Sequence, residues 1–120
     1  MFYRAKFQPG DKFIYGIYGI QYQGQSPSDW QLDLIQRFDK LITGQAHLDR
    51  ITVPGTDEMS TQIWLSYWWP ESHAKWWSTP AVKEFWDGLP EDAGMWREIL
   101  TVTASRVQNA CTAELKNGMN

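Results

Sequence analysis

The stretch "YWWPESHAKWWSTPAVKEFW", residues 67–86, combines the two residue types of this chain best suited to bind a flat, metal-containing ligand. It holds five tryptophans of the chain's eight and one histidine, His73. The indoles could fill a core or interface, or they could wall a pocket in which His73 ligates a metal. Tryptophan is usually well buried, and half of these rings recur at helix or strand spacing, which favours packing. His73 stands between Ser72 and Ala74 beside an acid and a base, which favours a solvated helix face.

The remaining candidates for chemistry do not form the pattern of a site. His47 lies in a predicted polar turn with Asp49 and Arg50, and neither histidine has acidic or cysteine companions at ligand spacing. No metal site is therefore predicted. Nothing near Cys111 would lower its thiol pKa, so a half-buried small hydrophobe is the expectation. No phosphate loop or nucleophile motif is present, and four acids in one loop are predicted to be solvated: Glu84, Asp87, Glu91 and Asp92.

Length and composition exclude several classes of protein. A chain of 120 residues is expected to form one domain. The balance of 11 Lys and Arg against 14 Asp and Glu, with no basic cluster, argues against nucleic acid as a partner. The single cysteine favours a reducing compartment. No apolar run approaches the ~18–20 residues of a membrane span, and the N-terminus lacks a signal-peptide core, so a cytoplasmic protein is expected.

The first half of the chain predicts a strand and a helix. Residues 13–23, "FIYGIYGIQYQ", are rich in Ile and Tyr, and both alternating sets are apolar, so both faces of this strand should be covered. Gly16 and Gly19 predict a bend or the close approach of another backbone. Residues 26–43 predict a helix that ends at Gly44, with Ser26 as its cap. The buried stripe of this helix is predicted to be Trp30, Leu34, Phe38, Leu41 and Ile42.

The second half predicts a hairpin, a broken helix and a last strand. Residues 47–53 and 60–69 read as the paired strands. A helix should follow Pro70 and be interrupted at Pro80, which fits the first turn of a second short helix capped by Ser78 or Thr79. Residues 87–94 are predicted to be a loop, and the last strand is placed in the later part of residues 95–112.

The order β-α-β-β-α-β predicts an α+β, ferredoxin-like fold, of the dimeric α+β barrel type, with a four-stranded antiparallel sheet and both helices on one face. We expect a lead-in over residues 1–12, the domain over 13–113 and an unstructured tail over 114–120. The other sheet face would need a second copy or a second domain to cover it. Such a domain is incomplete alone.

Four motifs in this order resemble the haem-containing aldoxime dehydratases. They are "YGIQY" in the first strand, "YWW" in the third, "WWSTPAVKEFW" in the broken helix and "MWREIL" before the last strand. The resemblance spans roughly residues 13–113 and corresponds to the first of the two ferredoxin-like halves of those enzymes. It implies a lyase that removes water from an aldoxime to give a nitrile. The haem iron of that family acts as a Lewis acid on the substrate nitrogen, and a distal histidine helps the hydroxyl leave.

The family's two histidines, and the serine and arginine that hold the oxime oxygen, lie beyond the matched segment. No catalytic residue is therefore identified here, and no haem is expected to bind this chain alone. Gln108 takes the place of a family glutamate that supports the distal histidine; its amide could hydrogen-bond an imidazole but not stabilise the imidazolium. The rings that would wall a pocket are Tyr22, Trp68 and Trp77.

The resemblance leaves three hypotheses. The chain is a fragment or N-terminal half of an aldoxime dehydratase-like haem lyase, inactive alone, which meets a second half through its open sheet face and then acts on a small aldoxime. Alternatively, it is a stand-alone α+β barrel that pairs with a second copy of itself, like small monooxygenases and stress-response barrels. The third hypothesis is a non-catalytic remnant.

Overall fold

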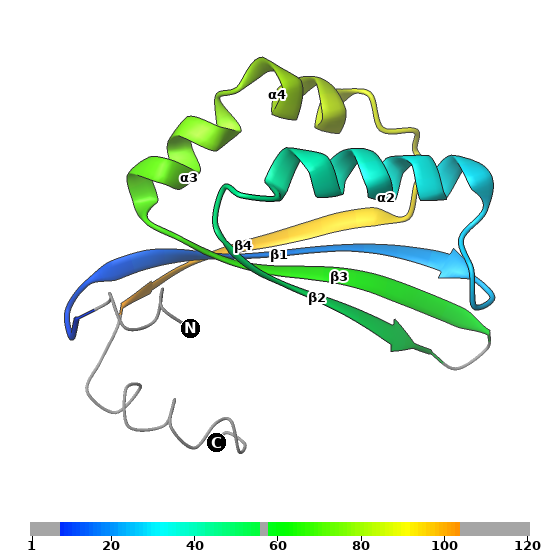
Figure 1. Ribbon diagram of the computed structural model, residues 1–120, viewed down its shortest axis with the longest axis horizontal. Coiled ribbons are helices and arrows are strands. Elements are labelled where there is room, and N and C mark those ends of the chain that lie inside the picture. The colour runs from blue at the N-terminus through cyan, green and yellow to red at the C-terminus, as the bar shows by residue number, and fades with distance from the viewer. Residues whose placement is uncertain (1–7, 56–57, 104–120) are drawn as a thin grey trace.

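The computed structural model describes residues 8–55 and 58–103, and this part of the chain contains four strands and three helices (Figure 1). Their order confirms the predicted β-α-β-β-α-β arrangement, with the second helix divided in two. The strands are β1 (Lys12–Gln23), β2 (His47–Pro54), β3 (Met59–Trp68) and β4 (Met95–Thr103). The helices are α2 (Asp29–Ile42), α3 (Pro70–Trp77) and α4 (Pro80–Asp87).

The four strands form one antiparallel sheet in the order β2-β3-β1-β4. β1, the first strand in the sequence, is therefore central, and β2 and β4 are the edges. Consecutive strands β2 and β3 form the predicted hairpin, whereas β1 pairs with β3 and β4 across the two helical connections. This is the ferredoxin-like topology that the sequence predicted.

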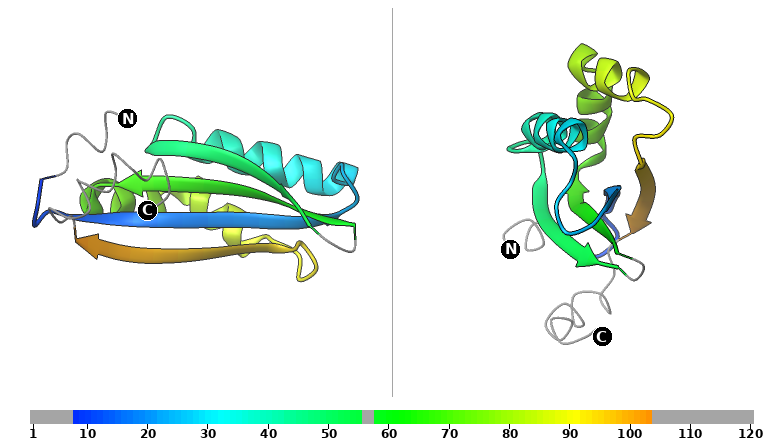
Figure 2. Two further views of the ribbon diagram at one scale, coloured as in Figure 1. Left: turned by 90° about the horizontal axis from the view of Figure 1, so that it is seen from below. Right: turned by 90° about the vertical axis from the view of Figure 1, so that its right-hand side faces the viewer.

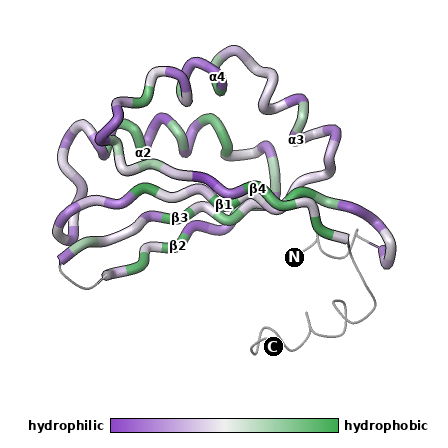
Figure 3. Tube along the Cα trace, turned by 180° about the vertical axis from the view of Figure 1, so that it is seen from behind, coloured by the Kyte–Doolittle hydropathy of each residue, from purple (hydrophilic) through white to green (hydrophobic). Residues whose placement is uncertain are grey.

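The three helices lie on one side of the sheet, which confirms the second part of the fold prediction. Figure 1 and the end view in Figure 2 place α2, α3 and α4 above the strands. No described helix covers the opposite side, which we call the open face (Figure 2). Hydrophobic positions recur along the strands (Figure 3), as expected for strands with an apolar side chain on each face.

At two glycines of β1, side chains of neighbouring residues occupy the space that a Cβ would take. A Cβ at Gly16 would stand 2.9 Å from both Ser66 Oγ and Tyr18 Oη, and a Cβ at Gly19 would overlap the indole of Trp96. A close approach was predicted at both positions, but the approaching groups are side chains and not another backbone.

The first helix begins later than predicted, and a different residue of its first turn is buried. α2 begins at Asp29, with Ser28 and not Ser26 at the N-cap, and ends at Ile42 before Gly44, whose φ is +83°. Trp30 is 44% exposed, so its placement in the buried stripe was wrong, although Leu34, Phe38 and Ile42 are buried as predicted. The buried face of the first turn instead carries Gln31, because its amide nitrogen donates to the carbonyl oxygens of Gln21 (2.9 Å) and Ala93 (3.1 Å).

The break in the second helix falls where the proline predicts it. α3 ends at Trp77, and α4 restarts with Pro80 in its first turn and Thr79 at the N-cap. The missing N–H of Pro80 costs nothing at this position, since the first N–H groups of a helix have no intrahelical acceptor.

The last strand begins earlier than predicted. β4 runs from Met95 to Thr103 and pairs with β1 from Ile20 back to Lys12, so "MWREIL" belongs to the strand and does not precede it. The β-branched residues further along had drawn the prediction toward the C-terminus. Gln108 and Cys111 lie outside the described residues, as do the tail and most of the lead-in.

Candidate functional site: the aromatic core and the open face

The space between the sheet and the helices is filled by aromatic rings in mutual contact. Phe38 of α2 meets Trp64 edge to face at 4.8 Å between ring centroids, and it also contacts the rings of Tyr18, Trp76 and Phe85. All five side chains are at least 96% buried. Each fully buried large side chain contributes about 1.5–3 kcal/mol to folding, so this cluster is a major part of the core.

The indole N–H groups of this region are mostly paired within the fold. Trp64 donates to Asp39, Trp68 to the hydroxyl of Ser66 (2.8 Å) and Trp76 to the Leu41 carbonyl (2.8 Å). Buried tryptophans with satisfied N–H groups need no ligand to complete their surroundings. The prediction that packing is the main role of the tryptophans is therefore supported by the three buried ones.

His73 does not lie on a solvated helix face, which corrects the prediction. It is half-buried, with the ring of Trp68 at 5.3 Å between centroids, and its Nε2 accepts a 2.8 Å hydrogen bond from Trp77 Nε1 one turn later on α3. Burial lowers the pKa of this imidazole. A neutral ring whose Nε2 is already engaged is poorly suited to ligate a metal through that atom.

A cationic stack adjoins His73 at the β4 edge of the sheet. The indoles of Trp77 and Trp86 stack at 5.9 Å, and the guanidinium carbon of Arg97 lies 4.9 and 4.6 Å from their centroids. Arg97 is held there because it is the register partner of Tyr18 on the helix side of β4. Two buried donors beside this stack, Tyr18 Oη and Trp86 Nε1, have no hydrogen-bond partner among the described residues.

The three rings expected to wall a pocket are not brought to one place. Trp68 is buried, Trp77 is half-buried, and His73 contacts both. Tyr22 is buried near the other end of β1: it opposes Ser60, whereas Trp68 opposes Ile14 eight residues away. At ~3.4 Å per residue this is a separation of roughly 27 Å along the strand.

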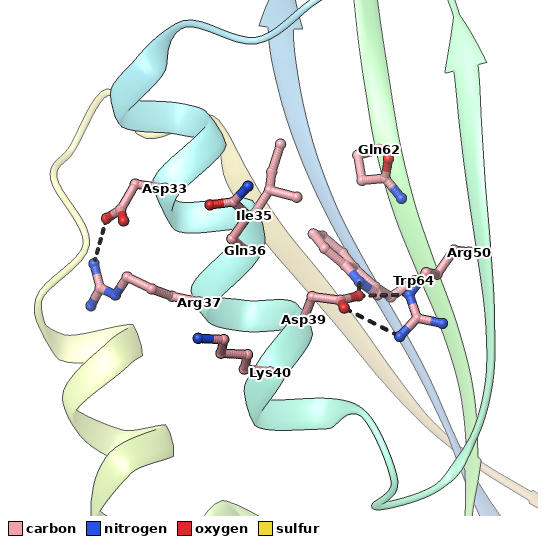
Figure 4. Close-up of a pocket in the computed structure, with 9 residues that line it drawn as sticks. All are labelled: Asp33, Ile35, Gln36, Arg37, Asp39, Lys40, Arg50, Gln62 and Trp64. Carbon is pink, nitrogen blue, oxygen red and sulfur yellow. Dashed lines mark hydrogen bonds and ion pairs between the residues drawn. The ribbon is translucent and has the colours of Figure 1, made fainter.

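An open groove of about 500 Å³ lies on the other flank, between α2 and strands β2 and β3 (Figure 4). At its centre the carboxylate of Asp39 accepts hydrogen bonds from Arg50 Nε (2.6 Å) and Trp64 Nε1 (3.0 Å). The bond from Arg50 is the largest cause of a lowered Asp39 pKa. Asp39 is thus an ionised, engaged carboxylate and no general base. The groove is also lined by Asp33, Ile35, Gln36, Arg37, Lys40 and Gln62.

Sequence reasoning missed this ion pair, since Asp39 and Arg50 lie on different elements that only the register of β2 brings together. It also missed the stacking of Arg97 on the indoles. Arginine near a tryptophan-rich segment was the available signal, but the pairing of β4 with β1 had to be known first.

The open face is apolar along its centre. Ile17 of β1 lies beside Leu65 of β3, and Tyr15 stacks on Tyr67 at 4.9 Å between ring centroids. Burial, followed by the proximity of Tyr67, raises the pKa of Tyr15 to about 12. Toward the edges, Ile51, Val53, Trp96 and Leu100 each remain 40–41% exposed. Exposed apolar side chains gathered on one face are typical of surfaces that bind a partner.

His47 lies on this face within the predicted strand over residues 47–53, so its separate assignment to a polar turn was wrong. It is the first residue of β2 and opposes Tyr67, with 5.8 Å between the two ring centroids. Its Nε2 is buried. Over residues 8–55 and 58–103 no group of three or more His, Cys, Asp or Glu side chains could hold a metal ion, and no helix there is long and apolar enough to cross a membrane.

Known proteins resemble this chain in both sequence and fold. It is 28% identical over 116 residues to the phenylacetaldoxime dehydratase of Bacillus sp. (strain OxB-1), a match that covers 92% of this chain and 33% of the relative. The chain thus spans about a third of that protein's length.

Solved structures share its fold. A crystal structure of aldoxime dehydratase superposes with a TM-score of 0.64 at 20% identity, over 82% of this chain and 34% of the other. An aldoxime dehydratase in complex with butyraldoxime gives 0.57 at 19% identity, over 80% and 30%. The hydroxynitrile lyase of Passiflora edulis gives 0.54 at 16% identity, over 82% and 97%.

A family model described as haem-containing dehydratase matches residues 16–120, which is most of the chain. Together with the dehydratase relative and the shared ferredoxin-like fold, this match shows that the chain belongs to the haem-containing dehydratases.

Proposed function

We propose that this chain is the first ferredoxin-like half of an aldoxime dehydratase-type haem lyase, and that its open face packs against a second half. The proposed reaction converts an aldoxime, RCH=NOH, into a nitrile, RC≡N, and water. The observation that carries the proposal is the exposed apolar face itself, found in a chain that spans 33% of its dehydratase relative. A surface of this kind is normally covered in a complete protein.

The described residues do not fit a haem of their own. Nε2 of His73 is occupied by Trp77, Nε2 of His47 is buried, and the space between helices and sheet is filled by rings. The described residues of this half therefore supply no iron ligand, and we propose that the companion half supplies the ligands. In the family, haem supplies a Lewis-acidic iron.

This half would contribute shape and rigidity to the pocket. Trp68 and Tyr22 are buried on the helix side of the sheet, so we propose that they support the pocket from behind, and that the partly exposed Trp77 beside His73 is the wall position nearest to solvent. The relatives act on or bind phenylacetaldoxime and butyraldoxime, and this supports small aldoximes with an apolar chain as the proposed substrate class. The single cysteine supports an intracellular setting for this enzyme.

A chimera tests the proposal. The matched third of the Bacillus phenylacetaldoxime dehydratase is replaced by this chain, and haem content and conversion of phenylacetaldoxime to phenylacetonitrile are measured. We expect a haem-loaded protein with measurable activity. A matched chimera with Ile17→Asp and Leu65→Asp should lose haem and activity together, because both changes place charge at the centre of the proposed contact.

The isolated chain is the second control. Titrated with hemin, it should give no stoichiometric six-coordinate Soret band. A sharp band from the isolated chain would contradict the proposal that the companion half supplies the iron ligands. A folded, haem-loaded but inactive chimera would contradict the proposed dehydratase function.

A further inference from the structure

The acidic and the basic side chains of the strands lie on opposite faces of the sheet. Asp49 on β2 and Glu98 on β4, the acidic residues within the four strands, both lie on the open face by register. The basic residues of the strands, Lys12, Arg50 and Arg97, lie on the helix side by the same alternation. Two of them have partners there: Arg50 binds Asp39, and Arg97 stacks on two indoles. The strands therefore give the open face two carboxylates and no Lys or Arg.

The two carboxylates stand at opposite rims of one row. Asp49 opposes Leu65, Leu65 opposes Ile17, and Ile17 opposes Glu98, so the row crosses all four strands. With strands ~4.8 Å apart, the two acids lie roughly 14 Å from each other. Both are exposed, and the positions between them are apolar. An apolar centre with charged groups at its rim is the usual organisation of a protein–protein interface.

We infer that the surface which covers the open face is a second sheet carrying Lys or Arg at its rims, opposite Asp49 and Glu98. This inference rests on the proposed function and names the chemistry of the missing half. A second copy of this chain fits the same face poorly. Such a dimer would bring four strand carboxylates into one interface, with no strand Lys or Arg on that face to pair with them. Like charges juxtaposed across an interface weaken the wrong pairing, and unpaired charges lose solvation there.

A charge-reversed copy of the chain provides the probe. The Asp49→Lys/Glu98→Lys variant of the 120-residue chain presents the same sheet with a basic rim, and it is mixed with the wild-type chain. Sedimentation velocity at low salt should show that the mixed pair forms with a dissociation constant at least ~10-fold lower than that of the wild-type chain with itself. The advantage should shrink as salt is raised from about 0.05 to about 0.5 M, because rim charges are screened.

The matched control moves the same charges off the open face. Glu84→Lys/Asp92→Lys changes the net charge equally at two exposed positions on α4 and the loop after it, and it should pair with the wild-type chain no better than the wild type does with itself. The inference is wrong if this control pairs with the wild-type chain as tightly as the charge-reversed variant does. It is also wrong if the wild-type chain pairs with itself as tightly as it does with that variant.

A neutral variant decides the case in which charge reversal prevents folding. Asp49→Asn/Glu98→Gln removes both charges, and melting followed by circular dichroism confirms that it folds. It should self-associate more tightly than the wild type at low salt; no gain would overturn the inference. These readouts report association alone, whereas the chimera reports haem and turnover, so the two proposals can fail separately.

Discussion

The indole of Trp96 lies across Gly19, its register partner on the open face of the sheet. The ring occupies the space where any other residue at position 19 would place its Cβ. Changing Gly19 to Ala should therefore displace the ring and cost about 1–3 kcal/mol of unfolding free energy in urea titrations. In a Trp96→Ala background the same change should be neutral or slightly stabilising, since Gly is unfavourable in a strand. If Gly19→Ala lowers the unfolding free energy equally in the wild type and in the Trp96→Ala variant, then the indole does not contact position 19.

Replacing Asp39 should destabilise the fold more than replacing its salt-bridge partner, Arg50. Asp39→Ala leaves the buried indole N–H of Trp64 without an acceptor, which should cost about 1–3 kcal/mol. Arg50→Ala removes an exposed ion pair and should cost at most about 1 kcal/mol. Chemical unfolding of both variants tests the ranking. Asp33→Ala, which breaks the exposed pair with Arg37, is the control and should stay within about 0.5 kcal/mol of the wild type.

The hydroxyl of Tyr18 should be dispensable for folding. It is buried without a hydrogen-bond partner among the described residues, and burial raises the pKa of Tyr18, so the hydroxyl stays protonated. Tyr18→Phe keeps the ring contacts with Phe38 and Trp76 and removes an unsatisfied donor. We expect unchanged stability or a gain of about 1 kcal/mol by thermal and urea unfolding. A loss above about 1 kcal/mol would reveal a partner for the hydroxyl.

His73 should make the fold less stable in mild acid. Burial lowers its folded-state pKa below the ordinary value of about 6.5, so the unfolded chain binds the proton more readily. Its contribution to stability is complete above about pH 6.5 and is lost as the pH falls through that value toward the folded-state pKa. Protonation also removes the Nε2 lone pair that accepts the Trp77 hydrogen bond.

Unfolding free energies measured between about pH 7.5 and pH 5.5 test this dependence. His73→Gln can still accept the indole hydrogen bond through its side-chain oxygen but does not titrate, so its profile should be flatter than that of the wild type. An identical slope in the wild type and His73→Gln would assign the effect to other groups.

The order of elements and the exposed apolar face could be predicted because both depend on local patterns. Alternating apolar sets in β1 indicate two covered faces, and the prolines at positions 70 and 80 mark the starts of α3 and α4. The register that sorts Asp49 and Glu98 onto one face also follows from alternation, once the strands are paired.

The incorrect predictions concern residues whose positions depend on tertiary contacts and not on the local sequence. Trp30 is the more hydrophobic residue, yet Gln31 is buried, because two carbonyl groups from β1 and the loop before β4 accept its N–H groups. His73 was assigned to solvent from its polar neighbours in sequence, but the rings of Trp68 and Trp77 cover it. The start of β4 was misplaced since only pairing with β1 fixes it.

The central position of β1 has a consequence for synthesis. Of the four described strands this one is synthesised first, yet one neighbour, β3, ends at residue 68 and the other, β4, ends at residue 103. Until Thr103 has emerged, nascent β1 has an unpaired edge, and its pairings span long loops that close slowly. The growing chain should therefore depend on chaperones during translation, and slow codons shortly before residue 95 would lengthen that exposure.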